Sequence, residues 1–213
     1  MNEFDFSCMN CKSLACDDGP FDEARTYPSF CPTKELEPAL KQEVIARYGE
    51  EENAVLMKAA AEVEAEGYCR WPRAEEIIRF AQKIGAKKIG IATCVGLIRE
   101  AEIFGRILKA RGFSCYSIGC KVGAIEKTAV GISEACSQVG EIMCNPILQA
   151  KLLEAEETDL NVVIGLCVGH DSLFYKYSAA PVTTLIAKDR VTGHNPAAAL
   201  YTANSYYKNL LKG

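Results

Sequence analysis

From residue 87 onward, the chain alternates between short apolar runs and longer amphipathic stretches. The apolar runs are typical of strands and cover residues 88–93, 113–119, 161–166 and 182–187. The stretches between and after them predict helices at 96–110, roughly 122–133, 146–156, 172–177 and 196–211. Strands and helices that alternate in this way are joined by right-handed crossovers, so the pattern predicts a parallel sheet with helices on both faces.

We therefore assign the chain to the α/β class, with a four-stranded parallel sheet in a three-layer arrangement similar to flavodoxin and Rossmann folds. This fold class favours the strand order 2-1-3-4. Residues 1–33 differ, because they form a cysteine-rich arm with little hydrophobic periodicity. Residues 34–84 have helical periodicity, with Leu56, Ala59 and Val63 on one face. The predicted domains are a metal-binding arm at 1–33 and an α/β domain at 34–213, in which a helical segment (34–84) precedes the sheet (87–213).

Cysteines stand at the predicted strand ends, and the chain has 11 of them. Cys94, Cys120 and Cys167 each follow an apolar run and precede a turn that contains a glycine. Because the carboxyl ends of parallel strands share one edge, where open α/β folds bind ligands, we expect these thiols at one crevice. Cys144 precedes an Asn-Pro pair that can open a helix, which places it at a similar position. The alternative is that all four are small buried hydrophobic residues.

Four further cysteines lie in the arm with the spacing Cys-x2-Cys-x4-Cys-x14-Cys-Pro: Cys8, Cys11, Cys16 and Cys31. Two cysteines separated by two residues can direct both sulfurs at one metal. Four thiolates suit Zn²⁺ or an iron–sulfur cluster, for which a 4Fe–4S cluster is our first choice. The simpler alternative is a zinc site that only folds the arm.

Both histidines fall in predicted loops near the same edge of the sheet. His170, with Asp171 beside it, and His194 are candidate catalytic residues that would donate protons or contact a metal-bound group. Alternatively, these segments only cap helices and satisfy backbone groups. Basic side chains could add positive potential at the crevice or could be ordinary surface charges: Lys121, Lys176, Lys188 and Arg190.

Composition and charge exclude several classes of protein. The net charge is −4 and the basic residues are scattered, whereas a nucleic-acid-binding surface needs a cationic stripe. No apolar run is long enough to span a bilayer, and the first residues lack the features of a secretory signal. We therefore expect a cytoplasmic protein whose partner is a small-molecule substrate or an electron-transfer protein, and which is compatible with homo-oligomerisation.

Several longer motifs resemble one family. They are CMNCKSLACDDG, YPSFCP, ATCVGL, IGCKVG, MCNP, LCVGHDS and AKDRVTGHNPAAALY. Together they resemble a domain-of-unknown-function family of cysteine-rich proteins labelled "metal-binding protein" and associated mainly with anaerobic microbes. The resemblance covers essentially the whole chain and implies metal binding through cysteines, without a settled reaction.

Three functional hypotheses follow. The first is an iron–sulfur enzyme for reductive or sulfur-removing chemistry, in which Cys94, Cys120 and Cys167 hold a cluster and Cys144 is a fourth ligand or a nearby thiolate. The second is an electron carrier without enzymatic activity, and the third is a structural or metal-storing zinc protein. We favour iron–sulfur binding because thiolates in loops near helix N–H donors suit sulfide-bearing clusters.

Overall fold

The computed structural model describes residues 7–212 and divides the chain into two compact units, residues 1–58 and 59–213. The first unit contains a short 3-10 helix (Cys8–Asn10), helix α1 (Pro38–Tyr48) and the start of helix α2 (Glu51–Gly67). Its residues 11–37 form turns without a regular helix or strand, consistent with the weak periodicity of the sequence there.

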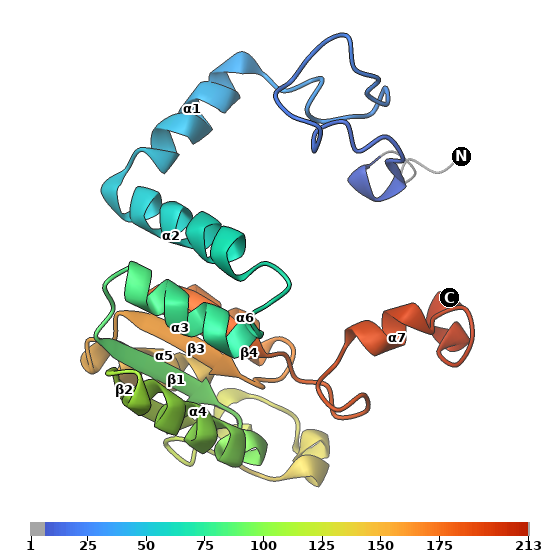
Figure 1. The fold of residues 1–213 in the computed structure, drawn as a ribbon. Helices are drawn as coiled ribbons and strands as arrows, with labels where there is room; N and C mark the ends of the chain where they lie inside the picture. Colours follow the sequence, from blue (N-terminus) through green and yellow to red (C-terminus); the bar gives the residue numbers. More distant parts are fainter. Residues whose placement is uncertain (1–6, 213) are drawn as a thin grey trace. The chain divides into compact units, whose positions relative to one another are not determined.

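The second unit is built on a four-stranded sheet in which all neighbouring strands are parallel (Figure 1). The strands are β1 (Lys88–Thr93), β2 (Ser114–Gly119), β3 (Leu160–Ile164) and β4 (Val182–Ile186). They lie in the order β2-β1-β3-β4. The predicted α/β class and strand order are therefore confirmed, and each strand lies within two residues of its apolar run.

Helices cover both faces of this sheet, because side chains of one strand alternate between two cores. Ile89 and Ile91 of β1 pack in the core formed with α3 (Arg73–Lys83) and α4 (Ile98–Ala110). Ala92 packs in the second core, with α5 (Pro146–Ala155) and α6 (His170–Tyr177). The three-layer arrangement follows from this alternation.

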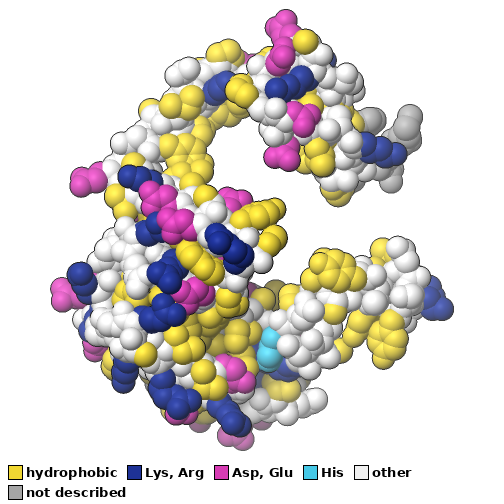
Figure 2. All heavy atoms as spheres, in the orientation of Figure 1, with side chains coloured by type: hydrophobic (Ala, Val, Ile, Leu, Met, Phe, Trp, Pro, Cys, Tyr) yellow, Lys and Arg dark blue, Asp and Glu magenta, His cyan; other side chains and the backbone are white. Residues whose placement is uncertain are grey.

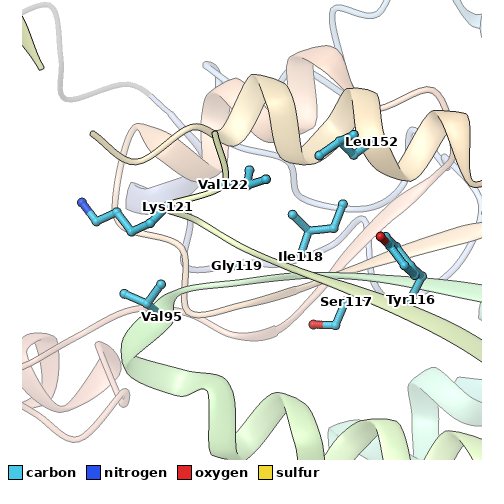
Figure 3. A pocket seen from close by; sticks show the side chains of 8 residues that line it. All are labelled: Val95, Tyr116, Ser117, Ile118, Gly119, Lys121, Val122 and Leu152. Atoms are coloured by element: carbon cyan, nitrogen blue, oxygen red, sulfur yellow. The ribbon is translucent and has the colours of Figure 1, made fainter. Parts of the chain in front are cut away.

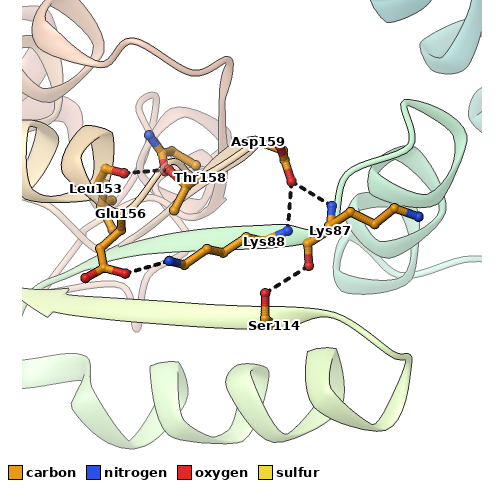
Figure 4. A network of polar contacts seen from close by, with 8 residues as sticks. Lys87, Lys88, Ser114, Leu153, Glu156, Thr158 and Asp159 are labelled. Carbon is orange, nitrogen blue, oxygen red and sulfur yellow. Dashed lines mark hydrogen bonds and ion pairs between the residues drawn. The ribbon is translucent and has the colours of Figure 1, made fainter.

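Polar contacts at the amino ends of the strands fix their starting positions (Figure 4). The Asp159 carboxylate accepts hydrogen bonds from the backbone N–H groups of Lys87 and Lys88, at 2.7 and 2.8 Å. The Lys88 ammonium also forms an ion pair with Glu156, and the Ser114 hydroxyl donates to the Lys87 carbonyl. Strands β1, β2 and β3 are thus held together at this edge, opposite the edge where the cysteines lie.

The predicted helix at 122–133 is wrong. The structure has only a 3-10 turn there, Thr128–Val130. Gly123 and Gly131 adopt φ values of +85° and +77°, and Ala124 has φ +46°, a left-handed backbone that interrupts a right-handed helix. The segment instead folds back on itself, with Glu126 bridged to Ile142.

The predicted helix at 196–211 is too long. The structure has a short helix α7 (Ala197–Tyr201) and a 3-10 turn (Lys208–Leu211). The Thr202 hydroxyl donates to the Ala198 carbonyl at 2.7 Å, so a side chain competes for a backbone acceptor where α7 ends. Leu200 and Tyr201 are exposed, so α7 buries no apolar face that would stabilise a longer helix.

The surface carries charges of both signs. On the face in Figure 2, Lys and Arg side chains are interspersed with Asp and Glu side chains. No helix in the described part of the chain has the length and apolar character needed to cross a membrane.

Candidate functional site

Two cysteines directly follow the ends of neighbouring strands. Thr93, the last residue of β1, is paired with Gly119 of β2 and with Ile164 of β3. The next residues in two of these strands are Cys94 and Cys120, which are 7% and 2% exposed. The strand register therefore brings the ends of β1 and β2 together at the carboxyl edge, as the sequence predicted.

A single turn directs two backbone donors at these sulfurs. The 3-10 turn Val95–Leu97 follows β1. Its Gly96 N–H donates to Cys94 Sγ at 3.4 Å, and its Val95 N–H donates to Cys120 Sγ at 3.5 Å. Backbone N–H groups directed at sulfur are contacts that a metal-bound thiolate also accepts.

The loop after β2 returns to the same edge and places Cys144 beside Cys120. The Asn145 N–H donates to the Cys120 carbonyl at 2.7 Å, and the Asn145 side chain caps α5 through the Leu148 N–H. The Cys120 thiol donates a hydrogen bond to the Cys144 sulfur, which lowers the pKa of Cys144. The same contact raises the pKa of Cys120. Lys121 and His170 lower the pKa of Cys144 further.

Cys167 reaches this edge through a tight turn after β3. Gly165 has φ +66°, and a Cβ atom at this position would lie 1.9 Å from a Leu97 methyl carbon, so the turn requires glycine. Cys167 Sγ accepts a hydrogen bond from Arg190 Nη2 at 3.0 Å. This bond raises the pKa of Arg190, and the charges of Cys94 and Cys144 raise it further. We call Cys94, Cys120, Cys144 and Cys167 the rim cysteines.

A buried glutamine supports the rim, and no sequence pattern predicted its role. Gln149 of α5 is fully buried, and its Nε2 donates to the carbonyls of Thr93 (3.1 Å) and Ile118 (2.7 Å). These carbonyls precede Cys94 by one residue and Cys120 by two. The side chain thus holds the ends of β1 and β2 together; only its position on α5 relative to the sheet reveals this.

The two histidines occupy different places. His170 begins α6, and its Nδ1 is buried without a hydrogen-bond partner among residues 7–212. The His170 backbone N–H donates to the Cys167 carbonyl at 2.9 Å, so this residue lies near the rim cysteines. His194 instead accepts the Asp189 N–H at 3.1 Å and closes its own loop, and Asp171 accepts the Ser172 N–H. The structure therefore brings His170 close to the thiols, while the contacts of His194 and Asp171 are local.

A shallow pocket adjoins the rim on the β2 side (Figure 3). It has a volume of about 360 Å³. Val95, Gly119 and Lys121 line it, and each of them is next to Cys94 or Cys120 in the sequence. The Lys121 ammonium donates to the Ile142 carbonyl, which ties the loop that carries Cys144 to the end of β2.

Local turns determine the positions of Cys8, Cys11, Cys16 and Cys31, which we call the arm cysteines. The Cys11 N–H donates to the Cys8 carbonyl at 3.1 Å, and the Cys31 N–H donates to the Pro28 carbonyl at 3.0 Å. Cys8 and Cys16 are exposed, whereas Cys31 is buried. The backbone N–H of Leu14 lowers the pKa of Cys11.

Neither set of cysteines forms a complete metal-binding shell. Within residues 7–212, no group of three or more Cys, His, Asp or Glu side chains has a geometry that could hold one metal ion. The donor chemistry at the rim nevertheless fits a thiolate-bound metal or cluster, with four sulfurs at one edge and N–H donors directed at two of them. In the arm, only the residue types and their spacing fit.

Comparison with known proteins identifies the family. A family model described as "Protein of unknown function (DUF1847)" matches residues 31–185, which is more than half of the chain. The chain belongs to this family. The match includes Cys31 and all four rim cysteines, whereas Cys8, Cys11 and Cys16 precede it.

One relative covers most of the chain. Uncharacterized protein MJ0455 of Methanocaldococcus jannaschii is 46% identical over 180 residues, which are 84% of this chain and 92% of the relative. No solved structure matches the chain. The predicted resemblance to a domain-of-unknown-function family is thus confirmed.

Proposed function

We propose that the rim cysteines bind an iron–sulfur cluster that serves redox or sulfur chemistry on a small molecule. The observation that carries this proposal is the position of the four thiols. Three elements of the sheet and one returning loop supply them to a single edge, where Val95 and Gly96 donate N–H groups to two of the sulfurs. Such donors and the surrounding burial are the means by which a protein tunes a cluster.

The residues around the thiols would each have a separate role. Cys94, Cys120 and Cys167 would be ligands in either case. With Cys144 as the fourth ligand, the cluster would supply one-electron transfer; with Cys144 as a nearby thiolate, one iron would stay open for a small molecule. Gln149 would hold the strand ends at a fixed separation. Within residues 7–212, the buried Nδ1 of His170 has no hydrogen-bond partner, and the His170 backbone N–H donates to the Cys167 carbonyl, so His170 would be the histidine that holds or donates a proton.

We propose a second metal site at the arm cysteines Cys8, Cys11, Cys16 and Cys31. A second iron–sulfur cluster would relay electrons, whereas Zn²⁺ would only fold the arm. A reducing compartment such as the cytoplasm would keep all these residues as thiols.

Metal analysis after strictly anaerobic purification tests the proposal. We expect iron and acid-labile sulfide, with visible absorption from the cluster. Zinc without iron or sulfide would contradict the iron–sulfur proposal and support a structural or metal-storing zinc protein. Reversible reduction without a change on adding candidate substrates would favour an electron carrier.

A pair of variants locates the cluster. Cys167→Ser should remove part of the visible absorption and part of the iron, because it removes a rim ligand. Cys69→Ser is the matched control, since Cys69 is exposed and lies outside both sets of cysteines. Equal iron content and equal absorption in the two variants would show that the rim does not hold the cluster.

A further inference from the structure

The loop after β4 places two cations at the rim cysteines. Arg190 Nη2 lies 3.0 Å from Cys167 Sγ. A methyl group built at Gly96 would lie 4.0 Å from Lys188 Nζ and 3.8 Å from Cys94 Sγ, so the ammonium and this sulfur border the same small space. We call Lys188 and Arg190 the basic pair.

Among the residues that the structure describes, no carboxylate neutralises these cations. Asp189 lies between them in sequence, but its carboxylate accepts the N–H groups of Val191 (2.9 Å) and Thr192 (3.0 Å). In the described residues, 7–212, neither Lys188 nor Arg190 forms an ion pair with a carboxylate. Positive charge therefore remains available beside the thiols.

Both side chains keep donors for a ligand. A guanidinium has five N–H donors, and one atom of Arg190 is engaged at Cys167. The Lys188 ammonium has three donors. Glycine at position 96 leaves the space between Lys188 and Cys94 without a side chain. A guanidinium and an ammonium together suit the planar or tetrahedral oxygens of a small anion.

We propose that Lys188 and Arg190 bind the anionic group of the small molecule on which the rim acts. The group is a carboxylate or a sulfur oxyanion, and the rest of the molecule extends toward the rim cysteines. This inference rests on the proposed function, because it takes the rim as the reactive site and names the chemical class of its substrate.

Alkylation of Cys167 with a charged and an uncharged reagent tests the proposal. Iodoacetate and iodoacetamide both form an S–C bond to the thiolate with loss of iodide, but only iodoacetate carries a carboxylate. The reduced, metal-free full chain is treated with each reagent, and the rate at every cysteine is followed by peptide mass spectrometry. We expect the iodoacetate-to-iodoacetamide rate ratio at Cys167 to be roughly tenfold higher than at exposed Cys69.

Variants assign the effect to the basic pair. Arg190→Gln and Lys188→Gln should each lower the ratio at Cys167 several-fold, while Arg190→Lys should retain most of it. Lys109→Gln removes the same charge from an exposed position on α4 and should leave the ratio unchanged. Using a ratio cancels changes in thiolate content, since both reagents require the thiolate. A Cys167 ratio equal to that of Cys69, or one that persists in Arg190→Gln and Lys188→Gln, overturns the proposal.

Competition distinguishes the two anion classes. Acetate and sulfate are added separately, with chloride at the same ionic strength as the control. Slower carboxymethylation of Cys167 with acetate indicates carboxylate recognition, and slowing with sulfate indicates oxyanion recognition. If neither anion slows the reaction more than chloride does, the proposal is overturned. Because the protein is metal-free here, the outcome is independent of the metal analysis that tests the cluster.

Discussion

The rim cysteines and the arm cysteines are two sets of four thiols that the fold positions in different ways. Cys94 and Cys120 are held by paired strands and are almost fully buried. Cys8 and Cys16 are exposed and lie in a 3-10 helix and a turn of a few residues each. The comparison shows that a sheet brings together thiols that are distant in sequence, whereas in a short loop-rich segment the thiols lie in local turns.

The local folding of the two sets should therefore depend on metal to different degrees. The rim is supported by two hydrophobic cores and by Gln149. Residues 11–37, which include three of the arm cysteines, have only two buried hydrophobic residues, Ala15 and Cys31. Metal binding should supply folding free energy to the arm and only occupy an existing site at the rim.

The largest expected effect is that of metal removal on protease sensitivity. This effect should be confined to the arm. We expect chelation under reducing conditions to expose residues 11–37 to proteases, while β1 to β4 remain protected from hydrogen exchange. The reason is that the arm loses its main source of folding free energy. Limited proteolysis with peptide mapping measures this effect.

A variant provides the control for metal removal. Cys31→Ser should reproduce the cleavage without a chelator, and Cys69→Ser should not. Equal protection of the arm before and after chelation would contradict the view that metal folds it.

The second-largest effect should be a difference in unfolding free energy between a leucine substitution in the second unit and one in the first. Leu153→Ala removes a fully buried side chain under β1 and should lower the free energy of unfolding by about 2–5 kcal/mol. Leu36→Ala in the first unit removes a side chain that is 41% exposed and should cost less than about 0.5 kcal/mol. Urea unfolding followed by circular dichroism measures both, and equal losses would be inconsistent with a core confined to the second unit.

Gln149→Met tests how the rim is held. The change keeps the side-chain length but removes two hydrogen bonds to buried carbonyls, so we expect a loss of about 1–3 kcal/mol in unfolding free energy. Metal content at the rim should fall while the arm retains its metal. Gln42→Met, at an exposed position in the first unit, is the control. Full rim occupancy in Gln149→Met would show that the strand ends need no such clamp.

The smallest expected effect is a difference in the pH at which individual cysteines become reactive to alkylation. The pKa of Cys144 is lowered by the Cys120 thiol, by Lys121 and by His170, so its thiolate should persist to lower pH than that of a free cysteine. In the metal-free protein, iodoacetamide should therefore still modify Cys144 at acidic pH values where N-acetylcysteine reacts slowly.

The comparison with the arm sharpens this pH test. The pKa of Cys11 is lowered by the backbone N–H of Leu14 instead. Lys121→Met should therefore shift the alkylation profile of Cys144 upward by less than about one pH unit and leave that of Cys11 unchanged. A shift of both profiles would indicate a general effect of net charge.

Much of the fold was predictable because the relevant signals are local. The apolar runs predicted β1 to β4 to within two residues, and the alternation of strands and helices predicted a parallel, three-layer sheet. The helix at 122–133 could not be judged from periodicity, since the positive φ values of Gly123, Ala124 and Gly131 depend on how the loop closes. The helix at 196–211 was overestimated because its apolar residues find no core to pack against.

The sequence by itself determined that Cys94, Cys120 and Cys167 follow strands, because an apolar run and the turn residues after it are local patterns of neighbouring residues. Only the tertiary structure decided that Cys144 contacts Cys120, that Gln149 joins two strand ends, and that Arg190 faces Cys167. These contacts join residues 23 to 56 positions apart in the sequence. They depend on the register of the sheet and on the path of its loops, which no short pattern specifies.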